Sequence, residues 1–143
     1  MIKEKIVVLD FGSQYAHLIA KRFRLLGYYS EIALPSAGLE AFEGAKGIVL
    51  SGGPASIYDK NAPEYNPAFF DLDIPVLGMC YGHYVVNKQY GGKIEKAAVG
   101  EFGYATLEKT AGKDCPLFEG ITMPAQVWMS HQDGVTVPGN GFE

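Results

Sequence analysis

The sequence is poor in cysteine and in basic residues, and it has no long apolar run. Its two cysteines, Cys80 and Cys115, are too few for a disulfide framework and lack the spacing of metal ligands. The 12 Lys and Arg against 16 Asp and Glu give a net charge of -4, which argues against a cationic face for nucleic acid. No segment approaches the roughly 18 apolar residues of a membrane span, and no signal-peptide core follows Met1. We therefore expect a cytoplasmic protein that binds neither nucleic acid nor membranes.

The composition is ordinary for a globular α/β protein. Of the 143 residues, 48% are hydrophobic and 20% are charged, with 18 glycines and 8 prolines. A chain of this length fits one domain and can bury a core. The sequence has no evident repeat, low-complexity tract or linker, so we expect a single domain over residues 1–143.

Strand and helix patterns alternate up to residue 92. The β-branched run of residues 5–12 precedes residues 13–27, where helical spacing predicts an apolar stripe made of Tyr15, Leu18, Ile19, Phe23 and Leu26. Further strands are predicted at 28–34, 46–54 and 74–78, and helical pieces at 35–44, 66–72 and 81–92. This alternation favours right-handed βαβ units. It predicts an α/β three-layer sandwich with a mainly parallel, flavodoxin-like central sheet.

Two segments depart from this alternation. Residues 55–74 are mostly a long connection rich in Pro, Asn, Asp and Tyr, and long ordered loops are often functional. After a double glycine, apolar and polar residues alternate over 93–110 and 125–141. That alternation predicts shorter strands of the antiparallel kind.

A cysteine stands between glycines at the end of the fourth predicted strand. Gly78, Cys80 and Gly82 form a G-x-C-x-G pattern, and a helix is predicted directly after it. A sharp strand-to-helix turn presents one side chain at its apex, and the helix N-terminus stabilises a thiolate there. Cys80 is therefore a candidate nucleophile, although the pattern alone also fits a buried core cysteine.

A glycine loop also ends the third predicted strand. Ligands gather at the carboxyl ends of parallel strands, so we expect the loop with Gly52 and Gly53 beside Cys80. The amides of these glycines and of Tyr81 are suited to hold an oxyanion. A nucleotide-gripping loop of the S-G-G-x-D-S kind is disfavoured, because Pro54 has no amide donor and no acid follows it.

Five short stretches, taken together and in this order, carry a resemblance to a known family. They are LDFGSQY, VLSGGPASIYD, PVLGMCYGH, EFGYATL and VWMSHQDGV. This set resembles the amidotransferase domains of GMP synthases, which are class I glutamine amidotransferases of the triad type, and it covers almost the whole chain. The resemblance implies hydrolysis of glutamine to glutamate and ammonia. It also implies transfer of the ammonia to an ATP-dependent synthetase that aminates XMP to GMP.

The resemblance implies a role for each matching residue. Cys80 is the nucleophile that forms a γ-glutamyl thioester, and the amides of Gly53 and Tyr81 supply the oxyanion hole. The further substrate-binding positions are Gly52, Tyr84, Ser130 and His131. No cofactor or metal is implied in this domain, because ATP and Mg2+ belong to the partner, an ATP-pyrophosphatase synthetase domain or subunit.

Three positions depart from the family's pattern. Tyr84 stands where the family has Gln, and a phenol cannot reproduce an amide's paired donor and acceptor. Gln132 replaces the glycine that follows His131 in the family, and Gly100 precedes Glu101 where the family has Arg. All three departures bear on the affinity for substrate.

The sequence contains no His-Pro-Glu motif, which in the family carries the general base and its orienting acid. We expect the chain to lack the C-terminal segment with this motif and to hydrolyse glutamine poorly on its own, since a cysteine nucleophile needs a base within reach. His17 is expected on the solvent side of its helix, and His83 is expected to point away from the turn. His131 is expected to hold substrate. Neither His83 nor His131 has a carboxylate partner evident from the sequence.

Two other functions stay open at this point. One is a non-catalytic amidotransferase-like module that binds glutamine or regulates a synthetase. The other is an amidotransferase of another pathway, such as anthranilate or carbamoyl phosphate synthesis, although the FGSQY and MSH-D stretches favour the purine enzyme.

Overall fold

The computed structural model describes residues 3–109 and 115–142, and it separates into two compact units. The first, here called the α/β unit, comprises Met1–Glu95 and Val135–Glu143. The second, here called the hairpin unit, comprises Lys96–Gly134. A chain expected to form one domain is thus built from two compact parts.

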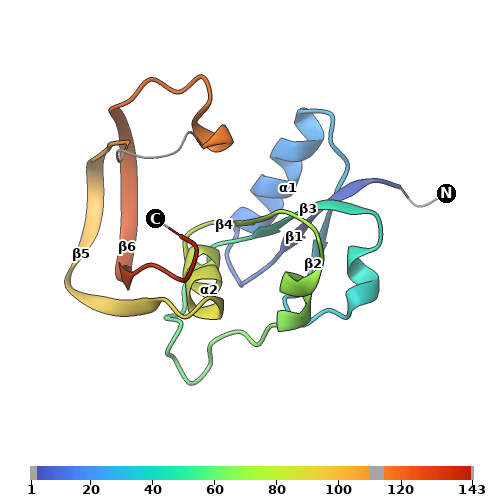
Figure 1. Ribbon diagram of the computed structural model, residues 1–143, viewed down its shortest axis with the longest axis horizontal. Helices are drawn as coiled ribbons and strands as arrows, with labels where there is room; N and C mark the ends of the chain where they lie inside the picture. The colour runs from blue at the N-terminus through green and yellow to red at the C-terminus, as the bar shows by residue number, and fades with distance from the viewer. Residues whose placement is uncertain (1–2, 110–114, 143) are drawn as a thin grey trace. The chain divides into compact units, whose positions relative to one another are not determined.

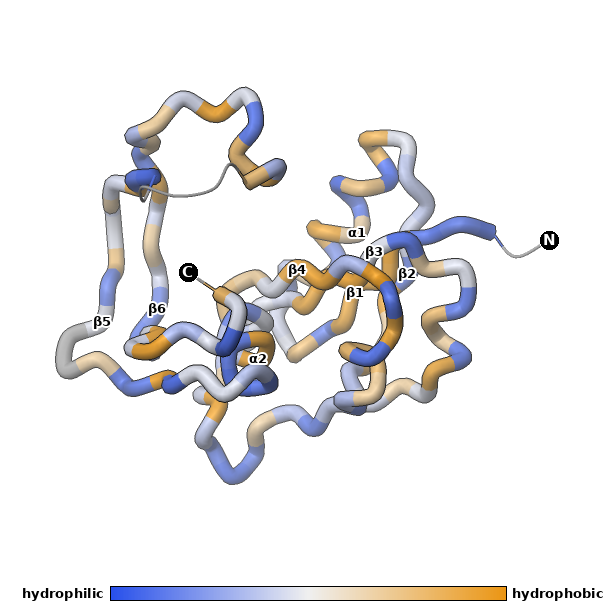
Figure 2. The backbone as a smooth tube through the Cα atoms, viewed as in Figure 1, coloured by the Kyte–Doolittle hydropathy of each residue, from blue (hydrophilic) through white to orange (hydrophobic). Residues whose placement is uncertain are grey.

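The α/β unit is built around a four-stranded sheet in the order β2-β1-β3-β4 (Figure 1). Its strands are β1 (Lys5–Leu9), β2 (Ser30–Ala33), β3 (Ala45–Leu50) and β4 (Val76–Gly78). All three pairings are parallel. Figure 2 shows apolar residues along these strands, as expected for a parallel sheet that is covered on both faces. The α/β class predicted from the sequence is confirmed.

The two faces of the sheet carry separate cores, because alternate side chains of a strand point in opposite directions. On one face, Val8 and Val49 pack against Ala16 and Ala20 of helix α1 (Tyr15–Leu25). The opposite face carries a larger cluster of strand and helix residues, among them Val7, Leu9, Ile48, Leu50, Phe42, Phe69 and Val85. The helical elements that supply it are η1 (Leu39–Phe42), η2 (Pro67–Asp71) and α2 (Tyr81–Gln89). The predicted three layers are therefore present.

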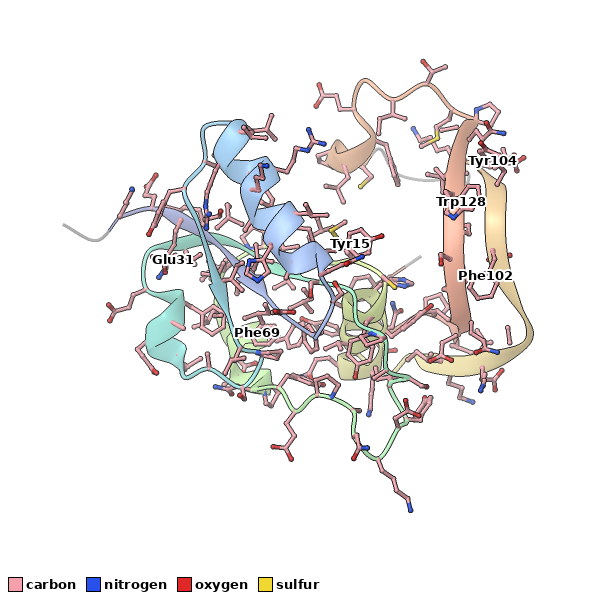
Figure 3. All side chains as sticks on the ribbon, turned by 180° about the vertical axis from the view of Figure 1, so that it is seen from behind. Tyr15, Glu31, Phe69, Phe102, Tyr104 and Trp128 are labelled. Atoms are coloured by element: carbon pink, nitrogen blue, oxygen red, sulfur yellow. The ribbon has the colours of Figure 1, made fainter. Side chains whose placement is uncertain are left out.

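Helix α1 buries only part of the predicted apolar stripe, since Ile19 and Phe23 are partly buried and pack against this core. Tyr15, Leu18 and Leu26, all placed in the apolar stripe, are exposed (Tyr15 is labelled in Figure 3). The residues that lie fully buried against the sheet are Ala16 and Ala20. Small side chains let a helix lie close to a sheet, whereas hydrophobic periodicity gives most weight to large ones. That difference explains the error.

The hairpin unit is formed mainly by two long strands that pair in a sheet of their own. Its elements are β5 (Lys93–Leu107), η3 (Pro116–Phe118) and β6 (Ala125–Val137). The first three residues of β5 and the last three of β6 belong to the α/β unit. Glu101 contacts His131 while Tyr104 contacts Trp128, so the strands run antiparallel. The antiparallel prediction is confirmed, but at 15 and 13 residues the strands are longer than expected.

The described side chains of the hairpin unit include no fully buried apolar one. The large aromatics Phe102, Tyr104 and Trp128 are 70%, 76% and 66% exposed (Figure 3). Asp133 is the one buried side chain among those described there. Across residues 3–109 and 115–142, no helix combines the length and apolar character needed to cross a membrane.

Candidate active site

Cys80 lies at the turn between β4 and α2, in a backbone conformation that is rare for its residue type. Its φ and ψ are 53° and -114°, and it is the one non-glycine residue with positive φ in the described part of the chain. Such a conformation costs on the order of 1–3 kcal/mol and persists where the surrounding structure holds it in place. The side chain is exposed at the start of α2. The predicted strand-to-helix turn is therefore confirmed.

The glycines on either side of Cys80 are required by close backbone contacts. A Cβ atom at position 78 would lie 2.6 Å from the Gly82 carbonyl oxygen, and one at position 82 would lie 2.4 Å from that of Leu50. Any larger residue would push α2 away from β3 and β4. The G-x-C-x-G pattern is thus what allows the turn to be this tight.

The SGGP loop lies directly beside Cys80, as the sequence predicted. A Cβ at position 52 would be 3.3 Å from the Cys80 Cβ and 3.7 Å from its Sγ. A Cβ at position 53 would be 2.5 Å from the Phe11 carbonyl oxygen, so the loop also packs tightly on the loop after β1. Loops from three neighbouring strands therefore meet at the thiol.

Ser51 ties these loops together and was not singled out from the sequence. Its buried hydroxyl accepts a hydrogen bond from the Phe11 amide and donates one to the Gly52 carbonyl, each at 3.0 Å. The Ser51 carbonyl accepts from the Gly82 amide at 3.1 Å. One serine thus connects β1, β3 and the first turn of α2. A buried small polar residue at a strand end is the signal that could have identified it.

Backbone amides without an acceptor are present at the turn of Cys80 and in the loop beside it. Within residues 3–109 and 115–142, the amides of Gly52, Gly53 and Tyr81 have no hydrogen-bond acceptor. The Tyr81 amide is also at the N-terminus of α2, where the helix dipole favours negative charge. This arrangement is suited to a carbonyl oxygen that gains charge when sulfur attacks its carbon.

The side chains of Tyr81 and Tyr84 point into the core rather than toward solvent. Tyr81 is 2% exposed, and the centroid of its ring is 5.3 Å from that of Phe11. The pKa of its phenol is raised mainly by burial and, to a lesser extent, by the nearby Tyr65 and Asp59. Tyr84 is 8% exposed and belongs to the same core cluster. Tyr81 is therefore placed to act through its amide, and Tyr84 also has a packing role.

The remaining predicted residues are on two helices and on the hairpin unit. His17 and His83 are exposed on α1 and α2, and Ser130 and His131 are on β6 in the hairpin unit. His131 has a carboxylate partner that was not evident from the sequence, because its Nε2 lies 2.9 Å from the Glu101 Oε2. The two residues are far apart in sequence and meet because β5 and β6 pair. Sequence spacing carries no signal for such a contact.

The comparison with protein families agrees with this geometry. The model of the class I glutamine amidotransferases matches residues 7–143. The match covers nearly the whole chain, including the turn at Cys80 and the glycine loop beside it. The chain belongs to the class I glutamine amidotransferases.

Within this family the chain is similar to GMP synthases. It is 47% identical over 141 residues to the glutamine-hydrolyzing GMP synthase of Pyrobaculum aerophilum, an alignment with 97% of this chain and 27% of that protein. It is 48% identical over 141 residues to the enzyme of the same name from Nitratiruptor sp., with 96% of this chain and 27% of that protein. The chain spans about a quarter of the length of the curated relatives it matches.

Solved structures share the fold. A protein of Thermoplasma acidophilum, whose name proposes that it is part of a GMP synthase, matches with a TM-score of 0.78 at 27% identity over 96% of this chain and 69% of that one. A glutamine amidotransferase from Methylobacillus flagellatus matches with a TM-score of 0.65 at 16% identity, over 96% and 59% of the two chains. The amidotransferase-like fold expected from the sequence is confirmed.

Proposed function

We propose that this chain is the glutaminase part of a GMP synthase and releases ammonia from glutamine for an ATP-dependent synthetase. The observation that carries the proposal is Cys80, held at a strained turn beside Gly52 in a chain that is similar to GMP synthases over nearly its whole length. On this proposal the synthetase is a partner domain or subunit that holds ATP and Mg2+ and aminates XMP to GMP. The glutaminase part itself uses no cofactor.

The proposed reaction begins with the Cys80 thiolate. Its sulfur attacks the carboxamide carbon of glutamine, and the amides of Gly53 and Tyr81 stabilise the charge on the carbonyl oxygen. Collapse of this intermediate breaks the C–N bond, and ammonia leaves with an added proton. A γ-glutamyl thioester stays on Cys80. Water then attacks the thioester carbon, which releases glutamate and restores the thiol.

Proton transfer is the step that the described residues support least. Ammonia must gain a proton and the attacking water must lose one, and positioned acid–base catalysis is worth about 10²- to 10⁴-fold for such steps. His17 and His83 are exposed on helices, and both ring nitrogens of His131 face acceptors of the hairpin unit. We therefore expect slow turnover by this chain.

The poor placement of the described histidines for proton transfer favours a second candidate function. A module that binds glutamine and regulates a synthetase needs the glycine loops and the donors around Cys80, but it needs no base. The two candidates differ in one respect that can be measured. Only the glutaminase forms a covalent acyl group on Cys80.

The test is to incubate the chain with glutamine, quench it in acid and determine the mass of the peptide that contains Cys80. We expect one γ-glutamyl group on Cys80 and slow release of glutamate. Cys80→Ala should lose the adduct, and Cys115→Ala, the matched change at the other thiol, should retain it. Glutamine binding without adduct or glutamate supports the regulatory module. If the chain shows no glutamine binding and forms no adduct, both candidates are contradicted.

A further inference from the structure

The outer face of helix α1 carries large apolar side chains that are exposed to solvent. Leu18 and Leu25, at the i and i+7 spacing that places two residues on the same side of a helix, are 55% and 71% exposed. Tyr15 begins the helix and Leu26 caps its other end, and both are exposed. A single exposed apolar residue is ordinary in a soluble protein. Several on one helix are typical of an interaction surface.

The packing of α1 explains why these leucines stay outside. The helix contacts the sheet through Ala16 and Ala20, with Ile19 and Phe23 partly buried beside them. The exposed leucines lie on the side of the helix away from this contact. Removing their surface from water would be favourable, so the face is suited to a second protein surface.

The same face is cationic. Residues 11–29 contain no Asp or Glu, although the whole chain has 16, and they include Lys21, Arg22 and Arg24. Arg24 donates a hydrogen bond to the Ser30 carbonyl oxygen at 2.9 Å. Lys21 and Arg22 are exposed between the two leucines, and neither forms an ion pair with a residue that the structure describes.

These charges restrict what can cover the face. A second copy of the chain docked through the same helix would bring Lys21 and Arg22 against their own equivalents, and like charges across an interface are costly. Nucleic acid is bound by larger sets of cations than these. A protein surface with an apolar centre and Asp or Glu around it matches both the leucines and the cations.

Helix α1 also begins at the candidate active site. Ser13 directly precedes the helix, and its Oγ is 3.8 Å from the place that a Cβ at Gly52 would take. The Cys80 Sγ is 3.7 Å from the same place. Tyr15 is exposed at this end of the helix (labelled in Figure 3). A partner on the outer face of α1 therefore extends to the edge of the site.

We propose that the outer face of α1, defined by Leu18, Lys21, Arg22 and Leu25, is the docking surface for the ATP-dependent synthetase. The synthetase is expected to meet it with apolar side chains flanked by carboxylates. This inference rests on the proposed function, which requires a synthetase near enough to receive the ammonia. It predicts that the face is exposed in this chain alone and covered in the natural protein that includes the synthetase.

The first test measures whether the face is covered. Leu25→Cys is placed in a background of Cys80→Ala and Cys115→Ala, and the rate of maleimide labelling is compared between this chain alone and the natural protein with its synthetase. Leu34→Cys, at an apolar side chain of the same unit that is 69% exposed, is the matched control. We expect the synthetase to slow labelling at position 25 about tenfold or more and to leave position 34 nearly unchanged.

Two results of this labelling would overturn the proposal. One is an equal rate at position 25 in the two proteins. The other is slow labelling at position 25 in the chain alone that becomes faster on dilution, because that would show a second copy as the occupant.

The second test asks whether the docking serves ammonia transfer in the natural protein. Arg22→Glu should lower GMP formation from glutamine about three- to tenfold, because it sets a carboxylate against carboxylates. GMP formation from added ammonium chloride and the γ-glutamyl adduct on Cys80 should stay nearly unchanged. Lys60→Glu, the same change of charge at an exposed residue outside α1, should affect none of the three.

An equal loss with glutamine and with ammonium chloride, or no loss with glutamine, would overturn the docking surface. If Cys80 forms no adduct in the unaltered protein, the proposed function fails instead. The labelling at position 25 then still decides whether the synthetase covers α1.

Discussion

The α/β unit and the hairpin unit hold their shapes by different means. In the first, β1 and β3 are covered on both faces, and Phe69 is fully buried among aromatic rings. In the second, every described apolar side chain is at least partly exposed, and the side-chain pairs include Tyr104 with Trp128 and Glu101 with His131. Exclusion of water stabilises the first unit. Backbone pairing and a few exposed contacts, each worth about 1 kcal/mol, hold the second.

This difference has a functional meaning. The strained backbone of Cys80 can persist only where many contacts fix it, and the α/β unit provides them through Ser51, Gly78 and Gly82. The candidate nucleophile is thus on the unit that has the buried core.

The largest expected effect is on hydrogen exchange. Amides of β1 and β3, such as those of Val8 and Val49, should exchange about a hundredfold or more slowly than those of Thr106 and Val127 in the hairpin unit. The reason is that buried strands open only in large unfolding events, whereas exposed pairs open locally. Two-dimensional NMR after transfer to deuterated water measures both sets together. Equal protection would contradict the comparison.

The next effect is on unfolding free energy. Phe69→Ala should cost about 3–5 kcal/mol, since the ring is fully buried with its centroid 4.3 Å from that of Phe70. Trp128→Ala removes a larger ring, but one that is 66% exposed, and should cost about 1 kcal/mol or less. Chemical denaturation of both variants checks this. A larger loss for Trp128→Ala would show that the hairpin unit has a core that its side-chain exposure does not reveal.

Each unit carries one cysteine, which allows a comparison of reactivity. Cys80 is exposed at a helix N-terminus beside Gly52, whereas Cys115 is half-buried. With a chloroketone analogue of glutamine at neutral pH, Cys80 should be modified about tenfold faster than Cys115. Peptide mass mapping after brief labelling gives the ratio. Iodoacetamide, which lacks the glutamine part, serves as the control, and preferential modification of Cys115 by the analogue would count against the site.

The smallest effect concerns a surface cluster of the α/β unit. Hydrogen bonds from Lys5, at 2.7 Å, and then from Tyr29, at 2.9 Å, lower the pKa of Glu31 (labelled in Figure 3). A carboxyl with a lowered folded pKa adds stability that is full above its unfolded pKa, about 4.3, and is lost as pH falls through the folded value. Solvent exposure limits the gain to less than about 1 kcal/mol.

Glu31→Gln should therefore lower the unfolding free energy slightly at pH 7, and the difference from the unaltered chain should shrink below about pH 4.3. Chemical denaturation of both proteins at several pH values measures this difference in unfolding free energy. Glu4→Gln, which alters a more exposed pair with Lys46, should show no such trend. A loss that grows toward low pH would mean that the Lys5 and Tyr29 contacts do not stabilise the folded state.

Much of the candidate site was predictable because its signals are local. Gly78, Cys80 and Gly82 are neighbours in sequence, and tight turns require such glycines. The position of Gly52 beside the thiol followed from one further rule, that parallel strands present their carboxyl ends at one edge. The incorrect prediction that Leu18 is buried on α1 also came from a local signal, because large apolar residues at helical spacing predict a buried stripe even where some of them are exposed.

By itself, the sequence determined the order of strands and helices and the turn that presents Cys80, since each depends on residues close together in the chain. It also determined the membership of the family, because five short local motifs follow one another in a fixed order. Only the tertiary structure decided that Ser51 connects three loops and that α1 buries its alanines. It also decided that Glu101 on β5 contacts His131 on β6. These contacts join residues that are distant in sequence. They form when strands pair and side chains exclude water, and no local pattern encodes which partners will meet.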